Sequence, residues 1–305
     1  MSSTSLDNAF EYQNATHSYT IKWTSLGAPE APPLVFIHGT PWSSRVWEPF
    51  AIALSRQFHV YLFDNPGFGE SPIEKPLPGT TPTFSCRTSE LDADLARQSE
   101  AFSALFQSWQ ADWGEQQAHV VAHDHAGLMS LRAHLLHDCQ YASLCLIDVV
   151  AIGPFGQSLF KSVAENPRHY EGLPDVEFEE ILERYIRDAA FAEVPKETMD
   201  MLKKPWLSDE GKRGFVRQLC QADSRNTDAV EGRYGEVGKK MPIKIIWGSQ
   251  DRWIPVETAQ RLGDALGARE VVAIEGAGHL IMYDQAAQLG VELGRWLGGL
   301  EASLR

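Results

Sequence analysis

Residues 120–130, VVAHDHAGLMS, end a run of aliphatic side chains on an aspartate that lies between two histidines. Around Asp124 the pattern is small, any, Asp, any, small, small, with Ala122 before it and Ala126 and Gly127 after it. Small neighbours are typical of a sharp turn from a strand into a helix, where the two elements pass close together and the backbone is strained. The pattern therefore favours Asp124 as a nucleophile. An Asp at a helix start is also a common stabilising cap, so helix capping stays open as the alternative.

A second acid and a histidine follow later in the chain. GSQDRWIP places Asp251 just after an apolar run, and GAGHLIMYD places His279 in the loop after the next run. A histidine needs an acid partner that fixes its tautomer and orientation before it can activate water. Asp148, at the end of LCLIDVV, is a rival for the acid role. We favour Asp251, because Gly248 and the residues at 253–255 frame it in the more usual turn.

The elements that must position these residues alternate between strands and helices. Apolar runs predict strands at 32–39, 58–67, 118–125, 141–151, 242–251 and 270–279. Helical patterns occupy 89–109 and 126–138, and further helices begin near residues 256 and 284. Continuous aliphatic strands that alternate with helices indicate an α/β fold with a mainly parallel sheet of about eight strands, covered on both faces. Ligands of such sheets bind beyond the carboxyl ends of the strands.

Residues 153–240 interrupt this alternation. They are charged and helix-prone, contain no strand-like run, and have aromatic residues distributed through them. We interpret this segment as a helical cap inserted into a single core, which is formed by residues 1–152 and 241–305. The cap would then cover the carboxyl ends of the strands, where the candidate catalytic residues lie.

The composition predicts a large core and an acidic surface. The 305 residues are 43% hydrophobic and carry a formal net charge of −14. Nucleic acids and anionic membranes need clustered positive charge, so neither is an expected partner. The beginning of the chain has no apolar leader, and no run approaches the length of a membrane span, so we expect a cytoplasmic protein. Four scattered cysteines without a CxxC pair, and histidines that fall on different elements, predict no metal site and no cofactor.

The order nucleophile, acid, histidine makes the chain resemble the α/β-hydrolase family over nearly its whole length. The motif HGTP at 38–41 resembles the HGxP stretch of haloalkane dehalogenases and epoxide hydrolases. This resemblance implies an oxyanion hole made by the backbone amides of Thr40 and His125. It also implies a set of substrate-binding residues, from the HGTP motif and from the tyrosines of the cap. These are His38, Pro41, Trp42, Tyr170, Tyr185 and Tyr234.

An aspartate nucleophile implies a particular chemistry. A carboxylate can displace a leaving group at a saturated carbon and form an alkyl ester, which water activated by His279 then hydrolyses. Dehalogenases that this chain resembles hold the halide with a Trp after the nucleophile and an Asn after His-Gly, where this chain has His125 and Thr40. Epoxide hydrolases instead protonate the epoxide oxygen with cap tyrosines. We therefore expect epoxide hydrolysis of a small apolar organic substrate.

Three other functions stay open. A haloalkane dehalogenase would need a different halide donor, for which a protonated His125 is available. An ester or lactone hydrolase could use Asp124 as a base for water. A non-catalytic binding protein could keep the pocket of an α/β-hydrolase without its activity.

Overall fold

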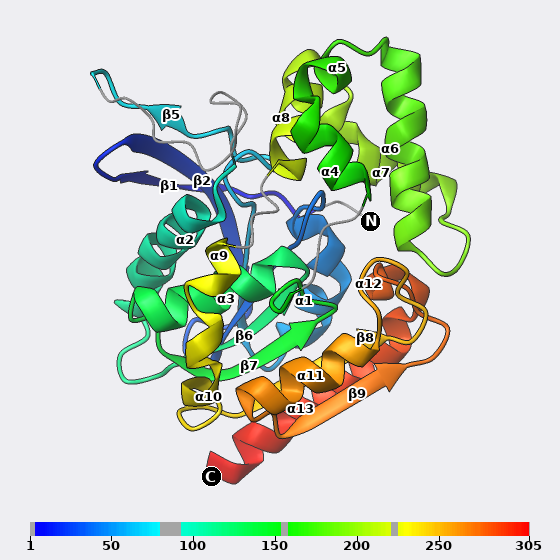
Figure 1. The fold of residues 1–305 in the computed structure, drawn as a ribbon. Coiled ribbons are helices and arrows are strands. Elements are labelled where there is room, and N and C mark those ends of the chain that lie inside the picture. The colour runs from blue at the N-terminus through cyan, green and yellow to red at the C-terminus, as the bar shows by residue number, and fades with distance from the viewer. Residues whose placement is uncertain (1–3, 80–92, 154–157, 221–224, 305) are drawn as a thin grey trace.

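The computed structural model describes residues 4–79, 93–153, 158–220 and 225–304 (Figure 1). These residues form a nine-stranded sheet, and six of the strands pair in parallel. The strands are β1 (Asn8–Gln13), β2 (His17–Leu26), β3 (Pro33–Ile37), β4 (His59–Phe63), β5 (Lys75–Pro76), β6 (Ala118–His123), β7 (Tyr141–Ile147), β8 (Ile243–Gly248) and β9 (Glu270–Ile274). The predicted architecture, a mainly parallel α/β sheet with helices on both faces, is confirmed.

The order of the strands is β1-β2-β4-β3-β6-β7-β8-β9, and β5 pairs with β2. Strands β3, β4 and β6 to β9 run parallel, whereas β1 and β2 are antiparallel and form one edge of the sheet. The sequence analysis predicted the parallel strands but not the hairpin of β1 and β2. Because the parallel strands share one direction, their carboxyl ends all lie at the same end of the sheet, and the site is built there.

Helices cover both faces of the sheet (Figure 1). Alternate residues of β3 show the two faces: Leu34 and Phe36 pack into one buried apolar cluster, and Val35 and Ile37 pack into the other. Helices α1 and α13 contribute to the first cluster, and helices α2, α3 and α11 contribute to the second. Their bounds are α1 (Glu48–Leu54), α2 (Leu95–Gln110), α3 (His125–Leu136), α11 (Glu257–Leu266), α12 (Ile281–Asp284) and α13 (Ala286–Leu304), with the 3₁₀ helix η1 (Ser44–Trp47) before α1.

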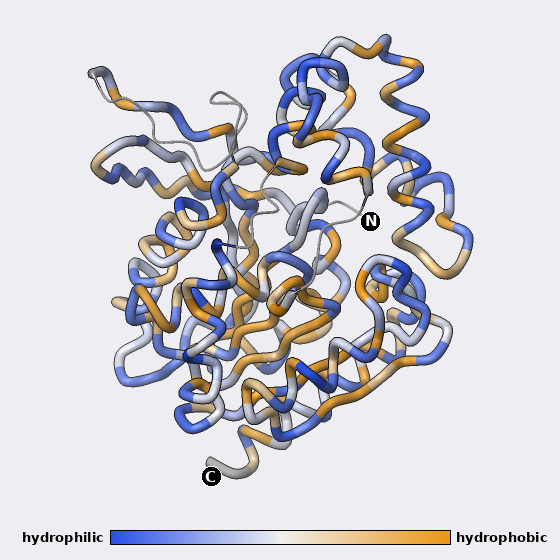
Figure 2. Tube along the Cα trace, viewed as in Figure 1, coloured by the Kyte–Doolittle hydropathy of each residue, from blue (hydrophilic) through white to orange (hydrophobic). Residues whose placement is uncertain are grey.

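The parallel strands in the interior of the sheet are mostly apolar, as Figure 2 shows. Each residue of β3, β6 and β8 is buried. This burial explains why these strands read as continuous aliphatic runs rather than as alternating patterns.

Between β7 and β8 the described residues form helices and no strand. The first group is α4 (Ser158–Glu165), α5 (Pro167–Glu171), α6 (Asp175–Ala189), α7 (Lys196–Lys203), η2 (Lys204–Trp206) and α8 (Asp209–Leu219). We call this group the helical layer, since it stands apart from the sheet in Figure 1. Trp206 joins it to the core, because its indole N–H donates to the carbonyl of Pro41 at 3.0 Å.

The second group is α9 (Arg225–Asp228), η3 (Glu231–Arg233) and α10 (Tyr234–Val237), which pack against the core instead. Arg132 of α3 donates to the carbonyl of Asn226, and Arg233 donates to the carbonyl of Leu135. The limits 153–240 of the cap stay a prediction. No helix in the described part of the chain is both long enough and apolar enough to span a membrane.

Candidate active site

Five parallel strands each bring one polar residue to the same edge of the sheet. Thr40 follows β3, Asp124 follows β6, Asp148 follows β7, Asp251 follows β8 and His279 follows β9. The four ionisable residues are all buried, and His279 is 0% exposed. The sequence places these residues far apart, and the parallel sheet brings them together.

The turn between β6 and α3 has a strained backbone at Asp124, with φ 57° and ψ −132°. Such a conformation costs a non-glycine residue about 1–3 kcal/mol. The turn depends on small neighbours: a Cβ on Gly127 would lie 2.4 Å from the Cβ of Val149, and one on Gly39 would lie 2.5 Å from the Cβ of Asp124. The Asp124 side chain makes no capping hydrogen bond to α3, so the structure excludes the helix-cap alternative.

His279 lies between two carboxylates. Its Nδ1 is 2.9 Å from Oδ2 of Asp251, and its Nε2 is 3.6 Å from Oδ1 of Asp124, which is longer than a hydrogen bond. The other oxygen of Asp251 accepts from the amides of Trp253 at 2.7 Å and Ile254 at 3.0 Å. Asp251 is therefore fixed by the backbone, and it holds His279 with Nδ1–H as donor and Nε2 towards Asp124.

The charges of these groups reinforce one another. Burial opposes ionisation of Asp124, but the contacts with His125 and His279 outweigh it and hold the pKa of this carboxyl below its usual range. Burial likewise disfavours a charged His279, yet Asp251 and Asp124 together raise the pKa of its imidazole well above the usual value. Both shifts favour the charged forms, an imidazolium at His279 and a carboxylate at Asp124.

Asp148 lies beside this group but has a different state. It is 0% exposed, its Oδ1 accepts from the amide of Gly248 at 2.7 Å, and its Oδ2 has no hydrogen-bond partner among the described residues. Burial first, and then the charge of Asp251, raises the pKa of the Asp148 carboxyl well above its usual range. The imidazole of His279 is in contact with Asp251, whereas the Asp148 carboxyl is bonded to the Gly248 amide.

Asp124 is held from the other side by Thr40. The Thr40 amide donates to Oδ2 of Asp124 at 2.7 Å, so this predicted oxyanion-hole donor already faces the carboxylate. The ring of His125 reaches the same oxygen, with Nδ1 at 3.3 Å, and this nitrogen is also 2.8 Å from the Thr40 hydroxyl. The sequence analysis expected His125 to act through its backbone amide and did not foresee the contact made by its ring.

His38 is where the structure corrects the sequence analysis. It is 0% exposed, its Nδ1 is 2.9 Å from the carbonyl of Gly39, and its Nε2 accepts from the amide of Asn65 at 2.9 Å. Burial lowers the pKa of His38 to about 4, against the opposing charge of Asp64. Both ring nitrogens are therefore committed to the backbone, so His38 supports the turn that carries Thr40 instead of contacting a substrate.

Aromatic rings form a wall beside Asp124 and His279. The rings of Trp42 and Trp253 stack with their centroids 6.2 Å apart. The ring centroid of Tyr185, on α6, lies 4.3 Å from that of Trp253. Trp253 in turn lies 4.8 Å from the ring of His279. Trp42 was expected at the site, but Trp253 was identified only as part of the turn around Asp251. Its position two residues after the acid is the signal that could have found it.

The three predicted cap tyrosines have different surroundings. The hydroxyl of Tyr185 is buried without a hydrogen-bond partner in the described structure, and burial, followed by the charges of Asp124 and Asp188, raises its pKa well above the usual range. The Tyr170 hydroxyl lies 2.7 Å from the hydroxyl of Ser162, in a cavity that Tyr185 also lines.

Tyr234 is not at the site. Its hydroxyl donates to the carbonyl of Ala151 at 2.6 Å, and its ring is buried in the apolar cluster below α3 and α11. The expectation that Tyr234 binds substrate is therefore corrected, because the segment that carries it has returned to the core.

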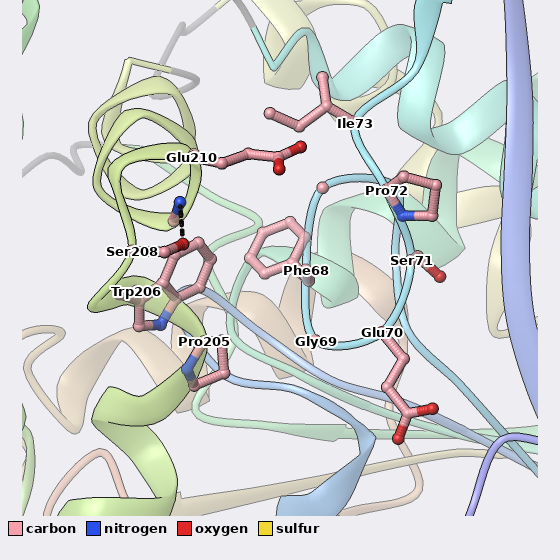
Figure 3. A pocket seen from close by; sticks show the side chains of 13 residues that line it. Phe68, Gly69, Glu70, Ser71, Pro72, Ile73, Pro205, Trp206, Ser208 and Glu210 are labelled. Carbon is pink, nitrogen blue, oxygen red and sulfur yellow. Dashed lines mark hydrogen bonds between the residues drawn. The ribbon is translucent and has the colours of Figure 1, made fainter.

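A cleft opens between the loop 67–73 and the helical layer (Figure 3). Phe68 and Trp206 line it with ring centroids 5.9 Å apart, and Figure 3 shows the Glu210 side chain extending from α8 towards Phe68 and Ile73. Phe68 also stacks on His125, with centroids 6.0 Å apart. The ring of Phe68 thus lies between this cleft and the ring of His125, the residue after Asp124.

In the part of the chain that the structure describes, no group of three or more histidine, cysteine or acidic side chains is arranged to hold a metal ion.

Comparison with known proteins gives concordant results. The sequence profile of the Alpha/beta hydrolase family matches residues 34–290. A haloalkane dehalogenase from Bradyrhizobium diazoefficiens is 21% identical over 93% of this chain and 92% of its own length. The dihydrolipoyllysine-residue acetyltransferase component of an acetoin cleaving system from Pseudomonas putida is 26% identical over 90% of this chain, which spans 65% of that protein. The crystal structure of an alpha/beta hydrolase fold protein from Burkholderia ambifaria has a TM-score of 0.83 at 32% identity, covering 96% of this chain and 98% of that one.

Proposed function

The chain belongs to the Alpha/beta hydrolase family, and we propose that Asp124 is its nucleophile in a two-step hydrolysis at a saturated carbon. The surroundings of Asp124 support this proposal most directly: one carboxylate oxygen is bonded to the Thr40 amide, and the other faces His279 at 3.6 Å. A carboxylate held in this way can attack with Oδ1 while Oδ2 becomes the carbonyl oxygen of an ester. The aromatic wall beside it favours a small apolar substrate.

The first step in the reaction we favour is the opening of an epoxide. The lowered pKa of Asp124 keeps its carboxylate charged. As Oδ1 bonds to a ring carbon, the carbon–oxygen bond of the epoxide breaks, and its oxygen takes the proton of the Tyr185 hydroxyl. Tyr185 suits this role because its hydroxyl is buried without a partner in the described structure and stays protonated. The proton on His279 then restores the Tyr185 hydroxyl.

The second step depends on the change in charge at Asp124. Esterification neutralises this carboxylate and removes one of the two charges that hold the proton on His279. Neutral His279 takes a proton from water, the hydroxide adds to the ester carbon, and the Thr40 amide stabilises the oxyanion at Oδ2. Collapse breaks the ester bond and releases the diol, whose oxygen takes the proton of the new carboxyl. The ion pair of His279 and Asp124 is thereby restored.

Carbon–halogen cleavage is the second candidate, and a specific observation favours it. A further donor, Nε1–H of Trp42, is buried without a hydrogen-bond partner among the described residues and could bind a leaving halide. The similarity to a haloalkane dehalogenase points the same way. The two candidates share Asp124, His279 and the hydrolysis of the ester. In halide cleavage the halide leaves as an anion and His279 gives its proton to solvent before that hydrolysis, so the two reactions differ in what stabilises the leaving group and in where the proton goes.

Trapping the ester tests the proposal. The His279→Gln variant, incubated with styrene oxide or n-butyl bromide, should stop after the first step, because only ester hydrolysis needs the histidine. Intact-protein mass spectrometry should show an added mass of the whole epoxide, or of n-butyl bromide minus hydrogen bromide, and peptide mapping should place it on Asp124. The Asp124→Asn variant should stay unmodified. A substrate that the wild-type protein consumes but that leaves His279→Gln unmodified would contradict covalent catalysis.

A further inference from the structure

His123, the residue before Asp124, makes a contact that the proposed reaction does not use. Its ring is 0% exposed, and its Nε2 lies 2.9 Å from the backbone carbonyl oxygen of His279. The centroids of the two imidazole rings are 4.8 Å apart. A nitrogen that faces a carbonyl oxygen must carry the proton, so Nε2–H of His123 is the donor. The last residue of β6 is thus bonded to the backbone of the histidine loop.

This contact completes the attachment of the His279 loop. The loop follows β9 and has Gly276 at φ 72°, with Gly278 directly before the histidine. The Gly278 amide donates to the carboxylate of Asp284 at 2.8 Å, and the Leu280 amide donates to the carbonyl of Ala189 at 3.0 Å. Both of these bonds hold residues beside the histidine. The bond from His123 holds the peptide of His279 itself, from which the imidazole projects.

The state of His123 suits a structural donor. Burial, followed by the charge of His279, lowers the pKa of His123 to about 3, so its ring is neutral beside the imidazolium. Its Nδ1 has no hydrogen-bond partner in the described part of the chain. Gly39 packs against this nitrogen so closely that an added Cβ would lie 3.0 Å from it. The ring is therefore confined between the turn that carries Thr40 and the loop that carries His279.

We propose that His123 is a positioning residue that holds the carbonyl of His279 through its Nε2–H and thereby aims the imidazole at Asp124. The inference rests on the proposed two-step reaction. Its consequence is specific to one step, because only ester hydrolysis uses His279 as a base. A misplacement of a reacting group by about 1 Å can slow a step by on the order of 100-fold, so loss of one hydrogen bond here has a measurable effect.

Three substitutions at position 123 distinguish the effect of the N–H donor from the effect of the aromatic ring. His123→Phe keeps an aromatic ring and loses the donor, His123→Gln offers an amide N–H that can reach the carbonyl, and His123→Asn offers one that is a methylene shorter. His119→Phe is the matched control, since His119 is buried on the same strand and bonds Ser143 and Glu301, away from the site. Thermal unfolding establishes which variants fold.

Rapid-quench mass spectrometry with styrene oxide and n-butyl bromide then measures formation and hydrolysis of the ester separately. His123→Phe should slow ester hydrolysis about tenfold or more and leave ester formation within about twofold, so the ester accumulates. His123→Gln should recover most of the lost rate, and His123→Asn should recover less. His119→Phe should show no accumulation, even if it unfolds at a lower temperature. If His123→Phe does not fold, the rates of ester hydrolysis of the Asn and Gln variants are compared instead. A faster rate for Gln than for Asn would show that the donor to the His279 carbonyl matters.

The inference is overturned if His123→Phe slows both steps equally, if His119→Phe accumulates as much ester, or if the Gln variant is no better than the others. Failure of the proposed function would look different. In that case the wild-type protein would consume substrate while even His279→Gln formed no ester, and the role of His123 would fall with it.

Discussion

The three aspartates in the site have different surroundings. Asp251 accepts backbone amides and faces the imidazolium, Asp124 faces the same imidazolium across 3.6 Å, and Asp148 is enclosed with one oxygen unpartnered in the described structure. The first two are placed to share the positive charge of His279, and Asp148 keeps its proton. Each carboxyl can therefore be given one role, and each role can be tested by a single substitution.

Asp251→Asn should lower kcat by on the order of 1,000-fold or more, because His279 would no longer be held with Nδ1–H as donor. The fold should persist, since an asparagine oxygen can still accept from the amides of Trp253 and Ile254. Steady-state kinetics and circular dichroism would measure the two effects. Asp148→Asn is the matched variant and should keep most of its activity. The reverse ranking would transfer the acid role to Asp148.

Tyr185→Phe distinguishes the two candidate reactions. It should slow ester formation from styrene oxide by about 100-fold or more, because the opening epoxide loses its proton donor. Ester formation from n-butyl bromide needs no proton and should change little. Tyr170→Phe is the control, because the Tyr170 hydroxyl already pairs with Ser162. Equal loss with both substrates would mean that Tyr185 only shapes the site.

At the scale of elements, the turn from β6 into α3 carries the site, and its geometry depends on residues without side chains. Gly127→Ala would place a Cβ 2.4 Å from the Cβ of Val149, which should destabilise the protein by about 1–3 kcal/mol. Gly294→Ala is the matched control within α13, where an added Cβ meets nothing within 4 Å and should stabilise by roughly 0.5–1 kcal/mol. Denaturant unfolding measures both. Similar effects of the two substitutions would contradict the close approach at the turn.

Some of these elements could be predicted from the sequence because the signals are local. Buried parallel strands appear as aliphatic runs, and the small residues around Asp124 mark the turn. The strand β2 was missed because its polar and apolar residues alternate and no continuous run appears. Such an antiparallel strand buries one face more than the other, so the alternating pattern is expected.

The surroundings of a side chain were harder to predict than its element. Tyr234 was assigned to the substrate site by its place in the inserted segment, but the contacts of Asn226 and Arg233 with α3 return that segment to the core. His38 was assigned by its motif, whereas its ring nitrogens bond Gly39 and Asn65. The positions of Tyr234 and His38 depend on partners distant in sequence or on the orientation of the ring. The spacing of residues along the sequence does not reveal either of these.

At the scale of the molecule, the site is assembled between the core and the helical layer. The core supplies Asp124 and His279, and α6 supplies Tyr185. The two parts are joined close to the reacting groups, because Asp284 accepts from the amide of Gly278 beside His279 and from the amides at 191 and 192 after α6. The position of the helical layer and the position of the His279 loop are therefore coupled.

The stability of the whole protein should depend on pH through Asp148. The raised pKa means that the folded protein keeps a proton on Asp148 that the unfolded chain releases above about pH 4. The contribution of this group to the free energy of unfolding therefore falls as pH rises from that value towards the folded-state pKa. Asp148→Asn removes the effect, so the variant should be more stable than wild type near about pH 7, and the difference should vanish near about pH 4. Denaturant titrations across this range check the sign, and a difference independent of pH would contradict it.

The central claim is that Asp124, not water, attacks the substrate. A single turnover with enzyme in excess, in water enriched in ¹⁸O and with either styrene oxide or n-butyl bromide, tests it most directly. Our account predicts a first-turnover product without the label, because its new oxygen comes from Asp124, and a labelled Asp124 carboxylate found by peptide mass spectrometry. A labelled product together with an unlabelled Asp124 would contradict the account, since water would then have attacked the substrate with Asp124 as its base.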